Sequence, residues 1–248
     1  MDTRIIDSHT HVGVAPFSSH NWTAEELLAS MDKAGISKAI IFPPGGGAPL
    51  TDYHEQNTKM AEAMNAHPDR LLAVPRINPH YGNKAVEEAE RCIQQLKMKG
   101  LKLHPDVESW VANSPIINPI WEVASRYKVP VIIHTWYTTK ASPYLLMDAA
   151  ERFRDVTFIL AHMGGPSAFG GVAVAKRNEN VMLDISTVFQ RNLLEAAVDN
   201  LGSDRLIFAS DWPFFDQSTG VHNVTVLNIS DEDKRKIFGE NVAKIFKA

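Results

Sequence analysis

The chain has 248 residues, of which 44% are hydrophobic and 22% are charged, as in ordinary globular proteins of one or two domains. Its formal net charge of −4 and its lack of a Lys/Arg cluster argue against nucleic-acid binding, and its single cysteine, Cys92, excludes an intramolecular disulfide. No apolar run approaches the roughly 18 residues that span a membrane, and no apolar leader precedes the first predicted strand. These features predict a cytoplasmic protein without a membrane partner.

Apolar runs rich in β-forming residues alternate with amphipathic stretches along the chain. The capping box Thr23-Ala24-Glu25-Glu26 opens the first helix, and Gly35 ends it. Strands are predicted at residues 5–11, 38–43, 71–78, 100–104, 129–135, 156–162, 181–186 and 205–211. Helices are predicted at residues 23–35, 52–66, 83–99, 118–127, 142–154, 167–177, 189–201 and 230–246. A long irregular loop is expected after the eighth strand.

Eight strands alternating with eight helices predict parallel strands joined by right-handed crossovers. The runs at residues 131–133, 158–160 and 206–208 are apolar throughout, as expected for strands that are buried on both faces. About 250 residues is the usual size of a (β/α)8 barrel. We therefore predict an α/β fold of the TIM-barrel type, with one domain over residues 1–248. A doubly wound open sheet is the alternative.

Polar residues stand at the carboxyl ends of these strands, where a barrel builds its active site. His9 and His11 are two residues apart at the end of the first strand, so both imidazoles face the same side. Such a pair suits a zinc-like ion, although a His-x-His pair is a weak signal by itself. The other polar residues at strand ends are Arg76, Asn78, Lys102, His104, His134, His162, Ser186 and Asp211.

The pattern resembles the amidohydrolase superfamily, and within it the amidohydrolase-related branch of metal-dependent TIM-barrel enzymes. The motifs that carry the resemblance are IDSHTH at 6–11, GLKLHP at 100–105, VIIHT at 131–135, LAHMGG at 160–165, ASDWP at 209–213 and IFGENVAKIF at 237–246. The resemblance implies that one divalent metal ion, with zinc as the expected element, is bound by His9, His11, His134 and Asp211. It implies that His162 acts on substrate or water, or holds a second metal ion.

Lys102 bears on the number of metal ions. Binuclear relatives bridge their two ions with a carboxylated lysine from the fourth strand. Lys102 and His104 share a face of that strand, and only one of them can occupy the bridging position. Because His104 lies closer to the strand end, we expect a single ion with His104 lining the pocket. A binuclear site is the alternative.

Other residues at the predicted mouth are candidates for binding a small-molecule substrate. Arg76 could hold a substrate carboxylate in a bidentate pair, or equally serve in a structural ion pair. Lys102, Trp136 and Trp212 are also expected to contact substrate, although both tryptophans could instead pack in the core or the rim. Asp7 is expected to orient a ligand or to close the bottom of the barrel.

The implied activity is hydrolysis of an amide, ester or lactone by metal-activated water, whose pKa falls toward about 7 on the ion. Asp211 would accept the proton of this water and pass it to the leaving group, while His162 would stabilise the oxyanion. The alternative in the same branch is non-oxidative decarboxylation of an aromatic or dienoic acid, with Arg76 or Lys102 binding the acid. A third alternative is a non-catalytic metal-binding barrel. A homodimer is expected by family analogy alone.

Overall fold

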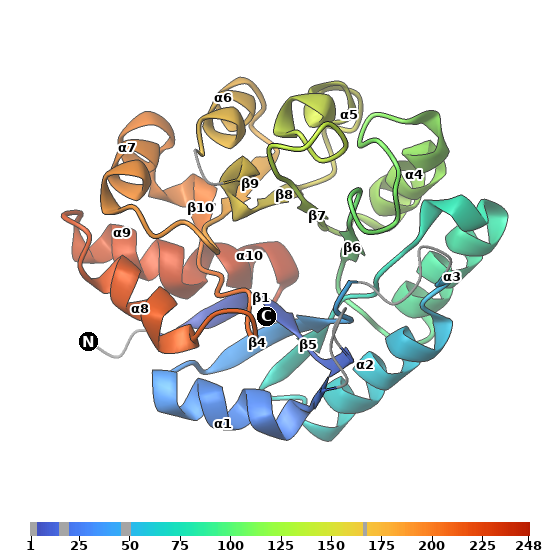
Figure 1. Cartoon of the computed structure of the whole chain (residues 1–248), viewed down its shortest axis with the longest axis horizontal. Coiled ribbons are helices and arrows are strands. Elements are labelled where there is room, and N and C mark those ends of the chain that lie inside the picture. The colour runs from blue at the N-terminus through green and yellow to red at the C-terminus, as the bar shows by residue number, and fades with distance from the viewer. Residues whose placement is uncertain (1–3, 15–19, 46–50, 166–167) are drawn as a thin grey trace.

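The computed structural model describes residues 4–14, 20–45, 51–165 and 168–248. Eight strands form an inner ring with helices around it (Figure 1). Two parallel sheets make up this ring, one with the strand order β1-β4-β5 and the other with the order β10-β9-β8-β7-β6. The strands of the ring are β1 Ile6–His11, β4 Lys38–Phe42, β5 Leu71–Ala73, β6 Leu101–Leu103, β7 Val131–His134, β8 Phe158–Ala161, β9 Val181–Asp184 and β10 Leu206–Ile207.

The two sheets join into a closed barrel at two seams. Thr10 pairs with Trp212 at one seam, and Arg76 pairs with Lys102 at the other, both as parallel bridges. Main-chain hydrogen bonds cross these seams, as from the His11 nitrogen to the Trp212 oxygen at 2.8 Å. The predicted (β/α)8 TIM barrel is therefore confirmed, and the open sheet is wrong, because strands at both sheet edges find partners.

The outer helices follow the predicted order. Helix α4 has the predicted bounds, most of the others are shorter, and the last predicted helix is divided between α9 and α10. The capping box forms at the start of α1, where the Thr23 side chain accepts a hydrogen bond from the Glu26 nitrogen and the Glu26 carboxylate accepts one from the Thr23 nitrogen. Gly35 ends this helix in the left-handed conformation. The helices are α1 Ala24–Ala34, α2 His54–Ala66, α3 Asn83–Gln94, α4 Asn118–Tyr127, α5 Met147–Arg152, α6 Phe169–Arg177, α7 Arg191–Leu201, α8 Gln217–Thr225, α9 Asp231–Arg235 and α10 Asn241–Phe246. None of them, within the described ranges, is long and apolar enough to cross a membrane.

One local prediction was wrong, and one local element was not predicted. A helix, α8, follows the eighth strand where an irregular loop was expected, and the Asp216 side chain caps it by accepting from the Ser218 nitrogen. The first strand is followed by an antiparallel hairpin of β2 Gly13–Val14 and β3 Asn21–Trp22 that was not predicted. Short polar and glycine-containing segments carry too little periodicity to predict either element.

The barrel interior has its own hydrophobic cluster, separate from the larger one between the strands and the outer helices. The strands contribute inward side chains such as Ile6, Ile132 and Ile159, and α10 contributes Val242 and Phe246. Phe246 lies beside Gly100, just before β6 begins, so α10 closes the amino-terminal end of the barrel. The polar residues are thereby left to the opposite, carboxyl-terminal end.

Candidate active site

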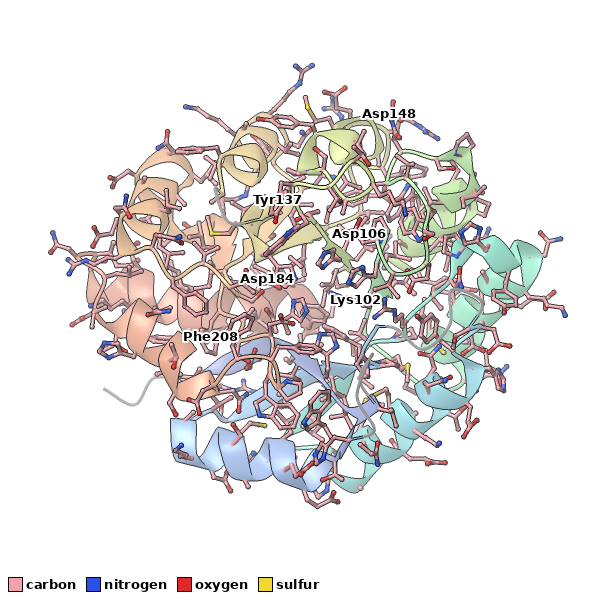
Figure 2. All side chains as sticks on the ribbon, viewed as in Figure 1. Lys102, Asp106, Tyr137, Asp148, Asp184 and Phe208 are labelled. Carbon is pink, nitrogen blue, oxygen red and sulfur yellow. The ribbon has the colours of Figure 1, made fainter. Side chains whose placement is uncertain are left out.

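The carboxyl ends of the barrel strands bring the predicted polar residues together. His9 and His11 point inward from β1 and are only 1% and 4% exposed. Lys102 and Arg76 are bridge partners across a seam, so their side chains lie on the same side of the barrel wall. Figure 2 shows Lys102 and Asp184 near the middle of the strand ring, whereas Asp148 lies on the outer helix α5.

The His9 imidazole is held at both nitrogens. Its Nδ1 lies 2.5 Å from Oδ2 of Asp184, a fully buried carboxylate at the end of β9. A carboxylate accepts hydrogen bonds, so Nδ1 carries the proton and Nε2 presents a lone pair to the centre. The Nζ of Lys102 lies 3.3 Å from this Nε2 and 4.5 Å above the Phe42 ring. Burial, and after it the charge of Lys102, holds the pKa of His9 well below its usual value.

The Asp211 carboxylate sits between the two histidines of β1. Its Oδ1 lies 3.2 Å from Nε2 of His9 and 3.2 Å from Nε2 of His11. Burial raises the pKa of Asp211 to about 6. The Asp211 backbone has a positive φ of 64°, which is costly for a non-glycine residue. Asp7 stabilises the turn, because its carboxylate accepts hydrogen bonds from the nitrogen and the hydroxyl of Ser210 at 3.0 and 2.6 Å.

A second group of histidines lines the other side of the centre. Nε2 of His162 lies 3.2 Å from Nδ1 of His134, and Nδ1 of His162 lies 2.7 Å from the Ser186 hydroxyl. Nε2 of His134 is 3.5 Å from the half-buried Asp106, and the His104 ring stacks on His134 at 3.7 Å. Burial lowers the pKa values of His134 and His162 to about 4, so both imidazoles are neutral at physiological pH.

These donors fit a bound divalent metal ion. His9, His162 and Asp211 each offer a ligand atom, and the three atoms lie within 4.8 Å of one another. Nε2 of His9 and Oδ1 of Asp211 face each other with lone pairs, a contact that requires positive charge nearby. Neutral imidazole and carboxylate suit zinc, manganese and iron alike. The predicted ligands His11 and His134 border this group, and His162, predicted to be catalytic, lies within it.

Lys102 and Arg76 are both buried cations, but they differ in their ion pairing. Lys102 is fully buried, and burial lowers its pKa to about 7. Arg76 is also fully buried, and its Nε donates to Oε1 of Glu108 at 2.8 Å. The same oxygen accepts from the Tyr53 hydroxyl at 2.8 Å, and Trp110 Nε1 lies 3.4 Å from the other oxygen. Arg76 therefore serves in a buried ion pair, the structural alternative considered for it, although its Nη2 has no hydrogen-bond partner among the described residues.

The two predicted tryptophans have different positions. Trp136 is half-buried, with its ring stacked near His134 at 6.1 Å and edge-on to His162 at 5.5 Å. Trp212 is 8% exposed and packs in the hydrophobic core. Phe214, two residues further on, reaches the site in place of Trp212, since its ring lies 5.5 Å from that of His11 and is 47% exposed.

The structure also brings in residues that were not predicted. Asp184, Asp106, Glu108 and Phe214 all contact predicted site residues. Asp184 ends β9 directly after Val181-Met182-Leu183, so its place at a strand end was a readable signal. Asp106 and Glu108 lie in the loop after β6, and no sequence signal assigns a loop side chain to a partner in another loop.

Comparison with known proteins identifies the family. The model of the amidohydrolase family matches residues 6–248.

The chain belongs to the amidohydrolase family.

Several curated relatives of this chain are decarboxylases. Gamma-resorcylate decarboxylase from Rhizobium sp. (strain MTP-10005) is 24% identical over 245 residues, which cover 77% of this chain and 74% of that protein. Gamma-resorcylate decarboxylase from Rhodococcus jostii (strain RHA1) is 23% identical over 250 residues, with 77% and 75% covered. The 2-amino-3-carboxymuconate-6-semialdehyde decarboxylase of Dictyostelium discoideum is 24% identical over 80 residues, 32% of this chain and 22% of that protein.

Several solved structures share the fold of this chain. The 2,6-dihydroxybenzoate decarboxylase from Rhizobium has a TM-score of 0.81 at 19% identity, with 99% of each chain covered. The 5-carboxyvanillate decarboxylase from Novosphingobium aromaticivorans, described with bound manganese, has a TM-score of 0.83 at 17% identity, with 100% of this chain and 97% of that chain covered.

These relatives overturn the expected reaction. The general expectation of an enzyme is confirmed, but the expectation of a hydrolase is wrong, because the curated relatives that cover most of the chain are decarboxylases. The error has a chemical reason. The same metal-binding motifs at the strand ends can polarise the carbonyl of an ester or hold the carboxylate of an acid, so the motifs alone do not separate the two reactions.

Proposed function

We propose that the protein is a metal-dependent, non-oxidative decarboxylase of an aromatic acid of the hydroxybenzoate type. The observation that carries the proposal is the agreement of the gamma-resorcylate decarboxylases, four proteins matched over 77% of this chain. The relative that acts on a carboxymuconate semialdehyde matches only 32% of the chain, which favours an aromatic over a dienoic substrate.

The reaction defines what the site must do. The bond between the ring carbon and the carboxylate breaks, carbon dioxide leaves, and the electron pair stays on the ring carbon, which then takes up one proton. The site must therefore hold a carboxylate, stabilise negative charge on the ring and supply the proton. Asp211 and His162 belong to the compact cluster of His9, His162 and Asp211, and both can carry that proton.

The buried cations and the metal ligands meet the first two requirements. Lys102 lies against His9 inside the barrel, and it gives the centre a positive group that forms no close ion pair with the described part of the chain. His9 and Asp211, with His162, His11 or His134, would hold a divalent ion, and manganese rather than zinc is the first choice because related enzymes are described with it. When bound, the ion would act as a Lewis acid toward the substrate oxygens.

The partly exposed aromatic side chains suit a flat substrate ring. Trp136 contacts His162 and His134, and Phe214 contacts His11, so each places an aromatic ring directly beside a metal-ligand candidate. Aromatic pairs of this kind stabilise a bound ring by about 0.5–1.5 kcal/mol beyond the burial of its surface.

The test is release of carbon dioxide from 2,6-dihydroxybenzoate and from 5-carboxyvanillate by protein loaded with manganese. We expect turnover of at least one of these acids, loss of turnover after chelation, and recovery when manganese is restored. Asp211→Asn should be inactive, whereas the matched change Asp199→Asn on the exposed face of α7 should be neutral. Cleavage of esters or lactones by a protein that releases no carbon dioxide from any aromatic acid would refute the proposal.

A further inference from the structure

Asp184 is a buried carboxylate that the sequence did not single out, and both of its oxygens are used. Oδ2 lies 2.5 Å from Nδ1 of His9, and Oδ1 accepts a hydrogen bond from the backbone nitrogen of Ser186 at 2.7 Å. The Ser186 hydroxyl in turn lies 2.7 Å from Nδ1 of His162. One side chain thus connects the two histidines of the compact cluster, across a separation of more than 150 positions in the chain.

We propose that Asp184 is a positioning residue that fixes the tautomer of His9 and, through Ser186, the orientation of His162. The proposal rests on the metal centre of the proposed function but not on the reaction that the centre performs. It assigns Asp184 no contact with substrate.

The first step of the argument concerns the tautomer of His9. A neutral imidazole has one N–H and one lone pair, and an ionised carboxylate can only accept. The 2.5 Å contact therefore keeps the proton on Nδ1 and leaves the lone pair on Nε2, which lies 3.2 Å from Asp211. Only this tautomer lets His9 bind a metal ion that Asp211 also binds.

The second step explains why an amide cannot replace this carboxylate. The backbone nitrogen of Ser186 is an obligatory donor, so an asparagine at position 184 must turn its single oxygen toward it. Its amide nitrogen would then face Nδ1 of His9, which would have to become the acceptor. The proton of His9 would move to Nε2, and the nitrogen that faces Asp211 would lose its lone pair.

The third step concerns His162. Oδ1 of Asp184 holds the Ser186 backbone, and Ser186 is 1% exposed, so its hydroxyl has little freedom to turn away from His162. His162 also has a positive φ of 60°, a conformation that needs such support. Removing the hydroxyl with Ser186→Ala leaves the contact between Asp184 and His9 in place, which allows the two roles to be separated.

The first experiment measures manganese binding by calorimetry on full-length protein that has been depleted of metal. We expect Asp184→Asn to weaken manganese binding about 10- to 100-fold, the usual effect of losing a carboxylate behind a metal-binding histidine. Asp199→Asn makes the same chemical change on the exposed face of α7 and should leave the affinity unchanged. An unchanged affinity in Asp184→Asn would overturn the proposal.

The second experiment reads the tautomer directly, and its deciding measurement is made on the wild-type protein. Nitrogen-15 spectra of metal-free, histidine-labelled wild-type protein should give the His9 signals of an imidazole protonated at Nδ1, with His9→Gln used to identify them. Asp184→Asn should give the opposite tautomer, and Ser186→Ala should leave His9 as in the wild type. A wild-type His9 protonated at Nε2 would contradict the proposal even if Asp184→Asn fails to fold.

These measurements separate the inference from the proposed reaction. Both are made without substrate, so absence of carbon dioxide release would refute the decarboxylase and leave the positioning role intact. If the wild-type protein is an active decarboxylase but Asp184→Asn keeps the wild-type manganese affinity, the proposed function stands and the positioning role of Asp184 is refuted.

Discussion

The buried pair of Arg76 and Glu108 gives the sharpest stability prediction. Both side chains are fully buried, and their closest atoms, Nε and Oε1, are 2.8 Å apart. In Glu108→Gln the side chain keeps its shape and an oxygen for the Tyr53 hydroxyl but loses its charge. The guanidinium of Arg76 would then be a buried cation without its partner, which costs about 3–5 kcal/mol of unfolding free energy.

The expected shift in melting temperature follows from the size of the chain. For about 250 residues, each kcal/mol lowers the melting temperature by roughly 2–4 °C, so Glu108→Gln should melt about 6–20 °C lower. Thermal unfolding followed by circular dichroism is the assay. Glu90→Gln is the matched control, because Glu90 pairs with Arg126 at the surface and such pairs contribute only about 0–1 kcal/mol.

The outcome distinguishes a structural from a substrate-binding Arg76. Equal melting temperatures for Glu108→Gln and Glu90→Gln would refute the reasoning, because they would mean that Arg76 is not held by Glu108. A double variant, Arg76→Met with Glu108→Leu, removes both charges and should recover much of the lost stability. If it also keeps full decarboxylation, Arg76 has no role in binding the acid.

Three further predictions concern other parts of the molecule. Asp211→Asn should bind manganese more weakly in calorimetry, in addition to losing turnover, because Oδ1 of Asp211 faces both histidines of β1. An unchanged manganese affinity would contradict the assignment of Asp211 as a metal ligand. Hydrogen bonds from Arg91 and Asn57 outweigh burial and lower the pKa of Glu88 to about 2, so its stabilising effect is complete above pH about 4.5 and is lost as the pH falls toward 2. Denaturant unfolding should therefore show the stability difference between wild type and Glu88→Gln shrinking over that range, and a difference independent of pH would argue against this network. Gly239 lies in the π-helical segment Lys236–Glu240 between α9 and α10. Gly239→Ala should lower the melting temperature by an amount equivalent to about 1–3 kcal/mol, since an added Cβ would meet the Arg4 carbonyl oxygen at 2.2 Å; a neutral effect would mean that this segment shifts freely.

Local sequence patterns predicted the barrel because they are set by short-range chemistry. The Thr23 to Glu26 capping box forms at the start of α1. The apolar runs at 131–133, 158–160 and 206–208 coincide with the barrel strands β7, β8 and β10, since burial on both faces favours apolar residues throughout a strand. Helix α8 was missed because its segment, 217–225, is polar and lacks a clear apolar period. Its start depends on a single cap at Asp216, a weak signal without the surrounding fold.

The amino-acid sequence alone was enough to predict which elements alternate, that His9, His11, His134, His162 and Asp211 stand at strand ends, and which family the chain belongs to. Periodicity and local motifs are properties of neighbouring residues, so they can be read without coordinates. Which side chains meet across the barrel became known from the three-dimensional arrangement of the strands and loops. Asp184 and Glu108 carry no motif, and their partners, His9 and Arg76, lie 175 and 32 positions away. Such pairs depend on how the strands are ordered and how the loops fold over them, and closure of the barrel sets both.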